Sequence, residues 1–366
     1  MPFITACRDF LSFGYGQNIY VYSTCGDSVY ETQISNPTDD EIKKNNNHSL
    51  ELIQAAFSPS CKHLVVCDNF KRLFLWDTSN WKAIGESSVE RKCVKILFDV
   101  SESKLLIADR SGDVFEYDME SFGAGKLVLG HLSMLLDIKV CPTGRYLITS
   151  DRDEKIRITN YPNSYNIHGY CLGHTEFVST LEVLSDRLLI SGAGDGSIRL
   201  WDYQTQQQLS VTFEKDDKNQ SKESCIRKVC GLEPNTIAVL LFGKCLLKVY
   251  SVIDNSLKVK HIVTLTSEPV DMFVYGDMLT IITLDASNLT YVFDKRSLQP
   301  VSSNDLVKIV NSNETFCNQF VKSFETNEIN TLFKQWFDNV EMYVKRKKER
   351  EDKEMQTKKR KEEITG

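Results

Sequence analysis

The residues suited to nucleophilic, acid–base or metal chemistry are few and widely spaced in this chain. The six histidines do not stand near cysteines or carboxylates at the intervals that metal ligands need. The sequence contains no phosphate-binding loop, no GxSxG elbow and no HExxH helix. Residues 192–196 (GAGDG) look like a phosphate loop, but strand-like runs flank them on both sides, whereas a phosphate loop joins a strand to a helix. The sequence therefore predicts no catalytic residue and no metal site, and favours a binding protein.

One set of polar residues does have a spacing with a physical meaning. His174, Ser191, Asp195 and Trp201 can form a buried tetrad in which the carboxylate accepts from the imidazole and the hydroxyl links imidazole to indole. The preceding segment offers His131, Thr149 and Asp153 for the same network, but it has Thr159 where the tryptophan would stand. Such a network holds a turn in place, so these residues are predicted to be structural.

The elements that position this tetrad repeat along the chain. Short strand-like runs recur behind tight turns, and most of their end residues lie 41 to 43 positions apart. Seven runs end at Tyr22, Trp76, Tyr117, Thr159, Trp201, Tyr250 and Phe293. Small twisted sheets of this kind cannot bury both faces alone, so they are expected to stack in a ring.

The dipeptides Trp76-Asp77 and Trp201-Asp202, with Gly130-His131 and Gly173-His174, resemble the signature of WD-repeat propellers. We therefore predict an all-β, seven-bladed WD-repeat β-propeller over residues 1–322, followed by a C-terminal α-helical extension. Polar insertions at 31–49 and 214–224 are expected to be mobile spacers. Ring closure stays open: residues 3–7 either pair with the last blade or begin the first, and residues 298–310 compete for the edge position.

Composition excludes several classes of protein. Hydrophobic and charged residues make up 41% and 26% of the chain, values typical of a globular protein, and no run has the length and apolar character of a membrane span. Arg8 and Asp9 interrupt the position of a secretory signal, and 11 scattered cysteines suggest free thiols. The formal net charge is −6, but residues 341–366 hold ten Lys or Arg against seven Asp or Glu. An acidic body is poorly suited to binding nucleic acid without a basic tail or partner.

The C-terminal segment has two parts. Residues 323–344 carry apolar side chains at helical spacing and are predicted to form an amphipathic docking helix. Residues 345–366 form a basic charged tail that begins with Lys345, Arg346, Lys347 and Lys348. The charge pattern leaves three roles open for the tail: contact with RNA phosphates, a nuclear import signal, or simple solubilisation.

Three stretches resemble one family in particular. Residues 151–157 (DRDEKIR), 171–179 (CLGHTEFVS) and 332–340 (LFKQWFDNV) are similar to the WD-repeat non-catalytic subunit of the eukaryotic tRNA (guanine-N7)-methyltransferase. This resemblance implies a heterodimer with a separate catalytic subunit that holds S-adenosylmethionine, so that this chain has no cofactor of its own. It also implies that the complex binds tRNA and forms N7-methylguanosine in the variable loop.

The resemblance further implies which residues contact the partner. In the family, charged residues of the blade with the DRDEKIR-like run grip the methyltransferase. Carried over, Arg157 faces an acidic residue of the partner, and Arg152, Glu154 and Lys155 lie beside it. Superposing the two repeats aligns Asp153 with Asp195, so Asp153 is predicted to belong to a turn tetrad and not to the interface.

Two other functions fit the same fold. WD-repeat proteins also serve as substrate receptors of ubiquitin ligases, but those receptors usually carry Arg two residues after the WD dipeptide, where this chain has Gln204 and Ser79. A general protein-interaction scaffold is the other alternative. The expected location is the nucleus, with the cytoplasm as a second site.

Overall fold

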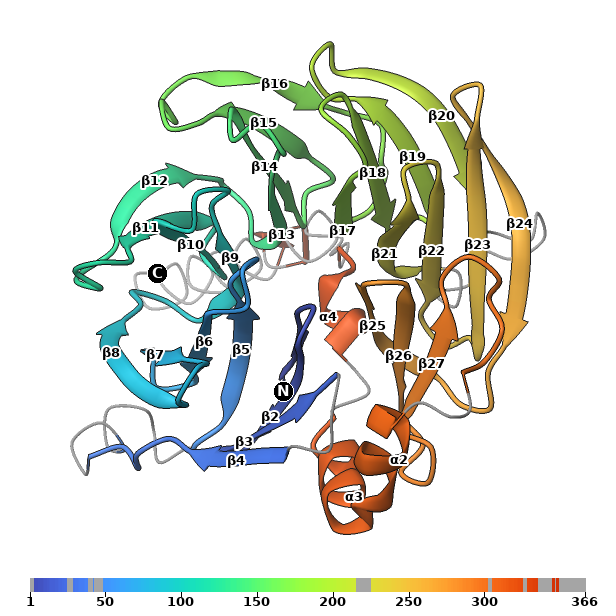
Figure 1. Ribbon diagram of the computed structural model, residues 1–366. Coiled ribbons are helices and arrows are strands. Elements are labelled where there is room, and N and C mark those ends of the chain that lie inside the picture. The colour runs from blue at the N-terminus through green and yellow to red at the C-terminus, as the bar shows by residue number, and fades with distance from the viewer. Residues whose placement is uncertain are drawn as a thin grey trace, which may run out of the picture. The chain divides into compact units, whose positions relative to one another are not determined.

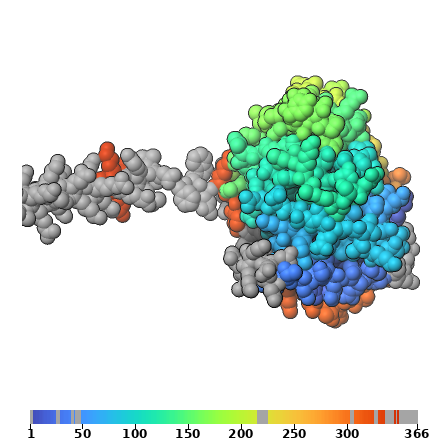
Figure 2. Space-filling model, turned by 90° about the vertical axis from the view of Figure 1, so that its left-hand side faces the viewer, coloured from blue at the N-terminus to red at the C-terminus, as the bar shows by residue number. Residues whose placement is uncertain are grey.

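The computed structural model describes residues 3–24, 29–38, 42, 49–214, 225–301, 305–324, 328–334, 344–345 and 347–348. Seven antiparallel sheets follow one another around a ring in chain order, which confirms the predicted seven-bladed propeller (Figure 1). The outer side of the ring shows blades 1 to 4 succeeding one another from blue to green (Figure 2). None of the helices in these residues has the length and apolar character needed to cross a membrane.

Six of the blades have four strands, numbered from the ring centre outward, and the seventh has three. Blades 1 and 2 contain β1 (Phe3–Ala6), β2 (Phe10–Tyr15), β3 (Asn18–Ser23), β4 (Val29–Gln33), and β5 (Leu52–Phe57), β6 (His63–Asp68), β7 (Arg72–Asp77), β8 (Lys82–Ser88). Blades 3 and 4 contain β9 (Cys93–Phe98), β10 (Lys104–Asp109), β11 (Asp113–Asp118), β12 (Lys126–Gly130), and β13 (Leu135–Val140), β14 (Tyr146–Asp151), β15 (Ile156–Asn160), β16 (Ile167–Cys171). Blades 5 to 7 contain β17 (Val178–Val183), β18 (Leu188–Ala193), β19 (Ser197–Asp202), β20 (Gln207–Phe213), then β21 (Ile226–Glu233), β22 (Thr236–Leu241), β23 (Leu246–Ile253), β24 (Ser256–Thr264), then β25 (Pro269–Tyr275), β26 (Met278–Thr283), β27 (Thr290–Asp294).

The core of the ring lies between neighbouring blades. The middle strands β18 and β19 of blade 5 are buried on both faces, because an adjacent blade covers each side. One cluster, for example, joins Ile190 and Leu200 of blade 5 to Val229 and Val239 of blade 6. Each sheet is therefore stable only as part of the ring.

The N-terminal segment begins the first blade. β1 pairs with β2 through four registered residues, from Phe3 opposite Gly14 to Ala6 opposite Leu11. Residues 3–7 were predicted either to pair with the last blade or to begin the first, and the structure shows that they begin the first. No strand from the N-terminus joins blade 7 in the described residues. The outer edge of β27 meets only a short segment: Phe293 forms a bridge with Pro300, and the Val301 amide donates to Val292.

Helices occupy the place where a fourth strand of blade 7 would lie. The first is α2 (Asp305–Ser312), whose Asn311 side chain accepts from the Thr290 amide at 3.1 Å and donates to the Thr290 carbonyl at 3.2 Å. The side chain of Asn311 thus satisfies backbone groups of β27 that a neighbouring strand would otherwise pair. The second is α3 (Glu314–Lys322), which begins where the side chain of Asn313 accepts from the Phe316 amide.

Together, α2 and α3 fill the space between the last blade and the first (Figure 1). Leu306 and Val310 of α2 and Phe316 and Phe320 of α3 share one buried cluster with residues of both blades, including Phe13, Tyr20, Ile282 and Leu289. We call α2 and α3 the clasp. The ring is closed here by a helical pair and not by a strand shared between the first and last blades.

The two predicted insertions are shorter than expected. Residues 31–33 belong to β4, and Ile34 is buried, so the first polar segment begins only after the strand. Glu214 is also anchored, because Lys248 and the Tyr250 hydroxyl both donate to its carboxylate. The rest of the second insertion, residues 215–224, lies outside the described residues.

A second compact unit, residues 329–366, follows the first, which ends at Glu328, a few residues beyond the boundary predicted at 322. The described part of the amphipathic segment contains the short α4 (Glu328–Leu332), and Val344 is 55% exposed. Lys345, Lys347 and Lys348 are helical and exposed. Arg346, the apolar positions from 335 to 343 and the tail from 349 onward fall outside the described residues.

Candidate functional site

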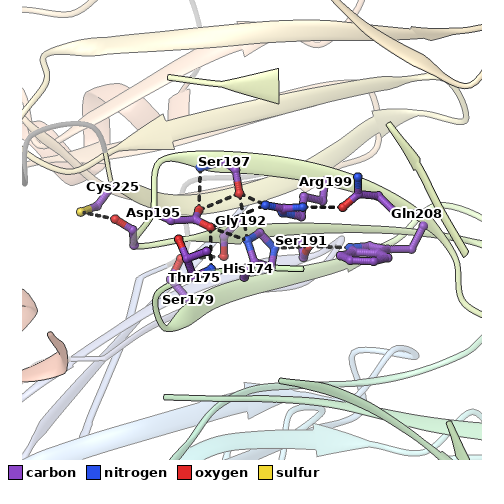
Figure 3. A network of polar contacts seen from close by, with 12 residues as sticks. His174, Thr175, Ser179, Ser191, Gly192, Asp195, Ser197, Arg199, Gln208 and Cys225 are labelled. Carbon is purple, nitrogen blue, oxygen red and sulfur yellow. Dashed lines mark hydrogen bonds and ion pairs between the residues drawn. The ribbon is translucent and has the colours of Figure 1, made fainter. Parts of the chain in front are cut away.

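The tetrad of blade 5 is fully assembled and buried (Figure 3). Nδ1 of His174 lies 3.3 Å from the Asp195 carboxylate, and Nε2 lies 2.7 Å from Ser191 Oγ. The Trp201 indole donates to the same hydroxyl at 2.8 Å. Ser197 adds a fifth member, because its hydroxyl donates to Asp195 at 2.6 Å. The network ties the loop before β17 to the turn between β18 and β19, which is a structural role.

Burial governs the charges in this network. It lowers the pKa of His174 despite the nearby Asp195 carboxylate, so the imidazole is neutral at physiological pH. Burial alone would raise the pKa of Asp195, but hydrogen bonds from His174, Ser197 and the Thr175 amide outweigh it and lower that pKa. The pair is thus a neutral histidine beside an ionised aspartate.

These shifts predict that acid destabilises the propeller in two steps. Below the ordinary histidine pKa of 6.5, the unfolded chain binds a proton that folded His174 does not, so the free energy of unfolding falls with pH. Below 3.8, the stabilisation from ionised Asp195 is lost as well. Melting temperatures measured between pH 7.5 and 5.5 should therefore drop in the wild type and less steeply in His174→Gln. Equal slopes in the wild type and in His174→Gln would contradict the assignment.

Blade 4 builds its network from a different aspartate than the sequence predicts. His131 Nδ1 lies 3.0 Å from Asp151, and Nε2 lies 2.8 Å from Thr149 Oγ1. The prediction that Asp153 takes part was therefore wrong. Asp151 stands at the end of β14, where its Oδ1 also accepts from the Lys155 amide at 3.0 Å. The indole that would complete the tetrad is missing, as expected from Thr159.

The strand-end aspartate is a feature that the repeat alignment missed. Asp68 in blade 2 and Asp109 in blade 3 end β6 and β10 in the same way, and each accepts from an amide of the following turn. Blade 5 has Ala193 at the end of the corresponding strand, and the aspartate that contacts its histidine is Asp195, two residues later. The signal was present in the sequence, because Asp68, Asp109 and Asp151 recur at intervals close to the repeat period.

The turn from Arg152 to Lys155, here the blade-4 turn, contains three of the four residues predicted to contact a partner. It joins β14 to β15, and the Arg152 amide donates to the Met134 carbonyl at 2.9 Å. Glu154 has a left-handed backbone with φ of +73°, a conformation that costs a residue with a side chain about 1 to 3 kcal/mol. Lys155 is exposed, whereas Arg152 and Glu154 are half-buried. The fold therefore brings Arg152, Glu154 and Lys155 together in one rigid turn.

The fourth predicted contact, Arg157, lies inside the blade. It is only 8% exposed, and its Nη1 donates to the Gly130 carbonyl at 2.9 Å. Burial lowers the pKa of its guanidinium, against the influence of the neighbouring Tyr170. Arg157 thus holds the end of β12, where the loop to β13 begins, and its guanidinium is buried in the blade and not presented at the surface.

The inner strands enclose a cavity of about 390 Å³ in the propeller. Its charged side chains pair across neighbouring blades: Lys139 with Glu182 at 2.8 Å, Arg227 with Glu268 at 2.5 Å, and Lys228 with Asp271. Such paired charges hold adjacent blades in register and leave little net charge to attract a ligand. In the part of the chain that the structure describes, no three His, Cys, Asp or Glu residues gather in a way that could hold a metal ion. The ten described cysteines are free thiols.

Comparison with known proteins agrees with this architecture. The profile of the family "tRNA methyltransferase TRM82 WD40 domain" matches residues 117–308. The non-catalytic subunit wdr4 of tRNA (guanine-N(7)-)-methyltransferase from Danio rerio is 35% identical over 321 residues, which cover 83% of this chain and 78% of the relative. The human subunit WDR4 is 39% identical over 201 residues, covering 52% of this chain and 49% of that protein.

Two solved structures share the fold alone, each at 14% identity. A chain of the mitotic checkpoint complex matches with a TM-score of 0.65, covering 76% of this chain and 85% of that one. The WD40 repeats of RRP9 match with a TM-score of 0.63, covering 76% and 84%. The sequence relatives are more informative, because the match to wdr4 extends over most of the propeller. On that evidence, the chain belongs to the family of WD-repeat non-catalytic subunits of tRNA (guanine-N7)-methyltransferase.

Proposed function

We propose that this chain binds a separate catalytic methyltransferase subunit as a heterodimer, keeps it active, and helps to position tRNA for N7-methylguanosine formation in the variable loop. The observation that carries the proposal is family membership, with 35% identity to the Danio rerio subunit over most of the chain. S-adenosylmethionine then belongs to the partner, and this chain contributes binding surfaces.

The blade-4 turn is the surface we assign to the catalytic subunit. Its support is twofold: the turn is held by backbone hydrogen bonds from Arg152 to Met134 and from Asp151 to Lys155, and it presents Lys155 to solvent. Charged groups of both signs in a fixed turn set the orientation of a partner more than they add to affinity. The whole chain has a formal net charge of −6, although residues 341–366 are net basic, so the propeller itself is acidic. This charge favours encounter with a basic protein.

Co-expression tests the proposal directly. The catalytic subunit would be purified alone and with this chain, and each preparation assayed for N7-methylguanosine in tRNA by mass spectrometry of nucleosides. We expect a stoichiometric complex and activity that depends on this chain. Full methylation by the catalytic subunit alone, or failure of the two chains to associate, would refute the proposed function.

The C-terminal cluster is proposed to contact tRNA phosphates. Changing Lys345, Arg346, Lys347 and Lys348 to Gln should weaken tRNA binding by the complex and flatten its dependence on salt. The slope of log K against log salt should fall by about 1 for each lost phosphate contact. The matched control changes Lys258 and Lys260, which are exposed on β24. An unchanged slope in the cluster variant would assign residues 345–348 to solubilisation.

We also propose that the protein acts in the nucleus as well as the cytoplasm. The support is the cluster Lys358-Lys-Arg-Lys361, whose composition is compatible with an import signal. Imaging of a fluorescent fusion with these four residues changed to Gln should show reduced nuclear signal, and an unaltered distribution would remove the cluster from import.

A further inference from the structure

Four exposed cations gather on one face of blades 2 and 3. Lys71 lies in the turn between β6 and β7, Arg91 and Lys92 lie in the loop before β9, and Arg110 lies in the turn between β10 and β11. In an antiparallel blade, the turn after the second strand and the loop after the fourth strand lie at the same end of the strands. The three segments therefore emerge on one face of the ring. We call Lys71, Arg91, Lys92 and Arg110 the basic patch.

Backbone hydrogen bonds tie the three segments of the basic patch together. The Val89 amide donates to the Lys71 carbonyl at 2.8 Å, and the Arg110 amide donates to the Lys92 carbonyl at 2.9 Å. The loop before β9 is thus bonded at its first residue to the turn of blade 2 and at its last residue to the turn of blade 3. The buried side chain of Val89 anchors it further. The backbone of the patch is preorganised, so binding a ligand requires only the side chains to be ordered.

The same kind of bonding continues from the basic patch to the blade-4 turn. The turn that contains Arg110 also contains Gly112, whose carbonyl accepts from the His131 amide at 2.8 Å. The loop that begins at His131 ends at Met134, whose carbonyl accepts from the Arg152 amide at 2.9 Å. The basic patch and the blade-4 turn therefore lie on the same face, joined through one short loop. A ligand held at the blade-4 turn by a partner could extend onto the patch.

The four side chains of the basic patch form no ion pair with any residue that the structure describes. Other cations of the propeller do pair, for example Lys104 with Asp118 at 2.6 Å and Lys139 with Glu182 at 2.8 Å. Glu90 is the only exposed acidic residue in the three segments, so four positive charges stand against one negative charge. Unpaired cations concentrated in this way create a local positive potential on a chain whose formal net charge is −6.

The composition of the three segments suits phosphate groups better than a protein or a membrane. They expose no large hydrophobic side chain, because Val89 is buried and Phe70 is half-buried. Protein interfaces place apolar or aromatic residues at their centre, and membrane-binding surfaces insert apolar side chains among the lipids. Arginine, by contrast, binds phosphate oxygens through two parallel hydrogen bonds, and lysine binds them as a point charge. The patch therefore fits a polyanion with successive phosphates, which is the backbone of a nucleic acid.

We infer that the basic patch binds the phosphate backbone of RNA, as a contact separate from residues 345–348. The identification of this RNA as tRNA rests on the proposed function. Phosphate contacts fix the position and orientation of a nucleic acid and do not read its sequence. The patch thus orients the tRNA on the face of the propeller that also bears the blade-4 turn.

The test uses the heterodimer and fluorescein-labelled tRNA, with affinity measured by fluorescence anisotropy over a range of potassium chloride concentrations. The patch variant changes Lys71, Arg91, Lys92 and Arg110 to Gln. Its affinity should fall by about ten-fold or more, and the slope of log K against log salt should fall by about 3 to 4, near 1 for each lost phosphate contact. Each single variant should lower the slope by about 1.

A matched control removes the same charge from the opposite face of blades 2 to 4. It changes four exposed residues at the other end of the strands to Gln, namely Lys62, Lys82, Lys126 and Arg145. The control should keep the wild-type affinity and slope. Both variants should keep the wild-type melting temperature, because all eight side chains are exposed. Vesicles with phosphatidylserine and a polyglutamate peptide serve as probes for a membrane and for an acidic protein.

The outcomes separate the inference from the function on which it rests. Unchanged tRNA affinity and slope in the patch variant, with an active heterodimer, overturn the inference and leave the proposed function standing. Equal losses in the patch and control variants assign the effect to net charge and also overturn it, as does weaker binding to vesicles or polyglutamate with tRNA binding intact. Failure of the wild-type heterodimer to form refutes the proposed function, and the same salt titration with this chain alone then decides on the patch. Loss confined to the patch variant supports the inference.

Discussion

Phe316→Ala should lower the free energy of unfolding by about 3 to 5 kcal/mol, the usual cost of removing a fully buried phenylalanine. Phe316 is 1% exposed, and its ring centroid lies 4.8 Å from that of Tyr20 and 5.3 Å from that of Phe13. The lost contacts are those between the clasp and blade 1. They lie at the junction of blades 7 and 1, where the ring closes without a strand shared between these two blades. Equilibrium unfolding in urea, followed by tryptophan fluorescence, measures the change.

Thr315→Ala is the matched control, because Thr315 is the preceding residue on α3 and is exposed. It should change the free energy of unfolding by less than about 0.5 kcal/mol. A chain ending at residue 324, which keeps the clasp, should fold, whereas a chain ending at residue 304 should not give a cooperative transition. Should Phe316→Ala cost less than about 1 kcal/mol, the clasp is peripheral and the ring closes without it.

The blades were predictable from the sequence, and the closure of the ring was not. Seven runs with aromatic ends and a period near 42 fix the number of sheets, because each run has to pair locally with its neighbours in the chain. Closure is a contact between the two ends of the propeller, for which the repeat has no information. The helical spacing of Leu306 and Val310 was present, but residues 298–310 also suit an edge strand, and only packing against blades 7 and 1 decides between them.

The candidate site, too, was predictable from the sequence only in part. Repeat alignment placed His174, Ser191 and Asp195 correctly relative to one another, but transferring that pattern to blade 4 selected Asp153 instead of Asp151. Both turns have a left-handed residue three positions after the end of the preceding strand: Glu154 after Asp151, and Gly196 after Ala193. A carboxylate at either of two positions can reach the same histidine, so sequence alone could not choose. Exposure was likewise out of reach: nothing in the repeat distinguishes buried Arg157 from exposed Lys155.

The burial of Arg157 determines what Arg157→Glu should do. The new carboxylate would stand beside the Gly130 carbonyl, which then loses its donor, and two acceptors would be buried together. We expect a loss of about 1 to 3 kcal/mol in the free energy of unfolding, and displacement of the loop between β12 and β13, whose Met134 carbonyl accepts from the Arg152 amide of the blade-4 turn. Binding to the catalytic subunit should then fall by about ten-fold or more, although Arg157 itself presents little surface to a partner.

Comparison with Lys155→Glu separates positioning from contact. Lys155 is exposed, so its reversal should weaken the complex without lowering the melting temperature, whereas Arg157→Glu should lower both. Arg157→Lys keeps the charge but not the planar fork that reaches Gly130, so it should give an intermediate loss of binding. If Arg157→Glu abolishes binding while the melting temperature and the hydrogen exchange of residues 130–134 stay unchanged, Arg157 contacts the partner directly, as the family resemblance implies, and its role in holding the loop is secondary.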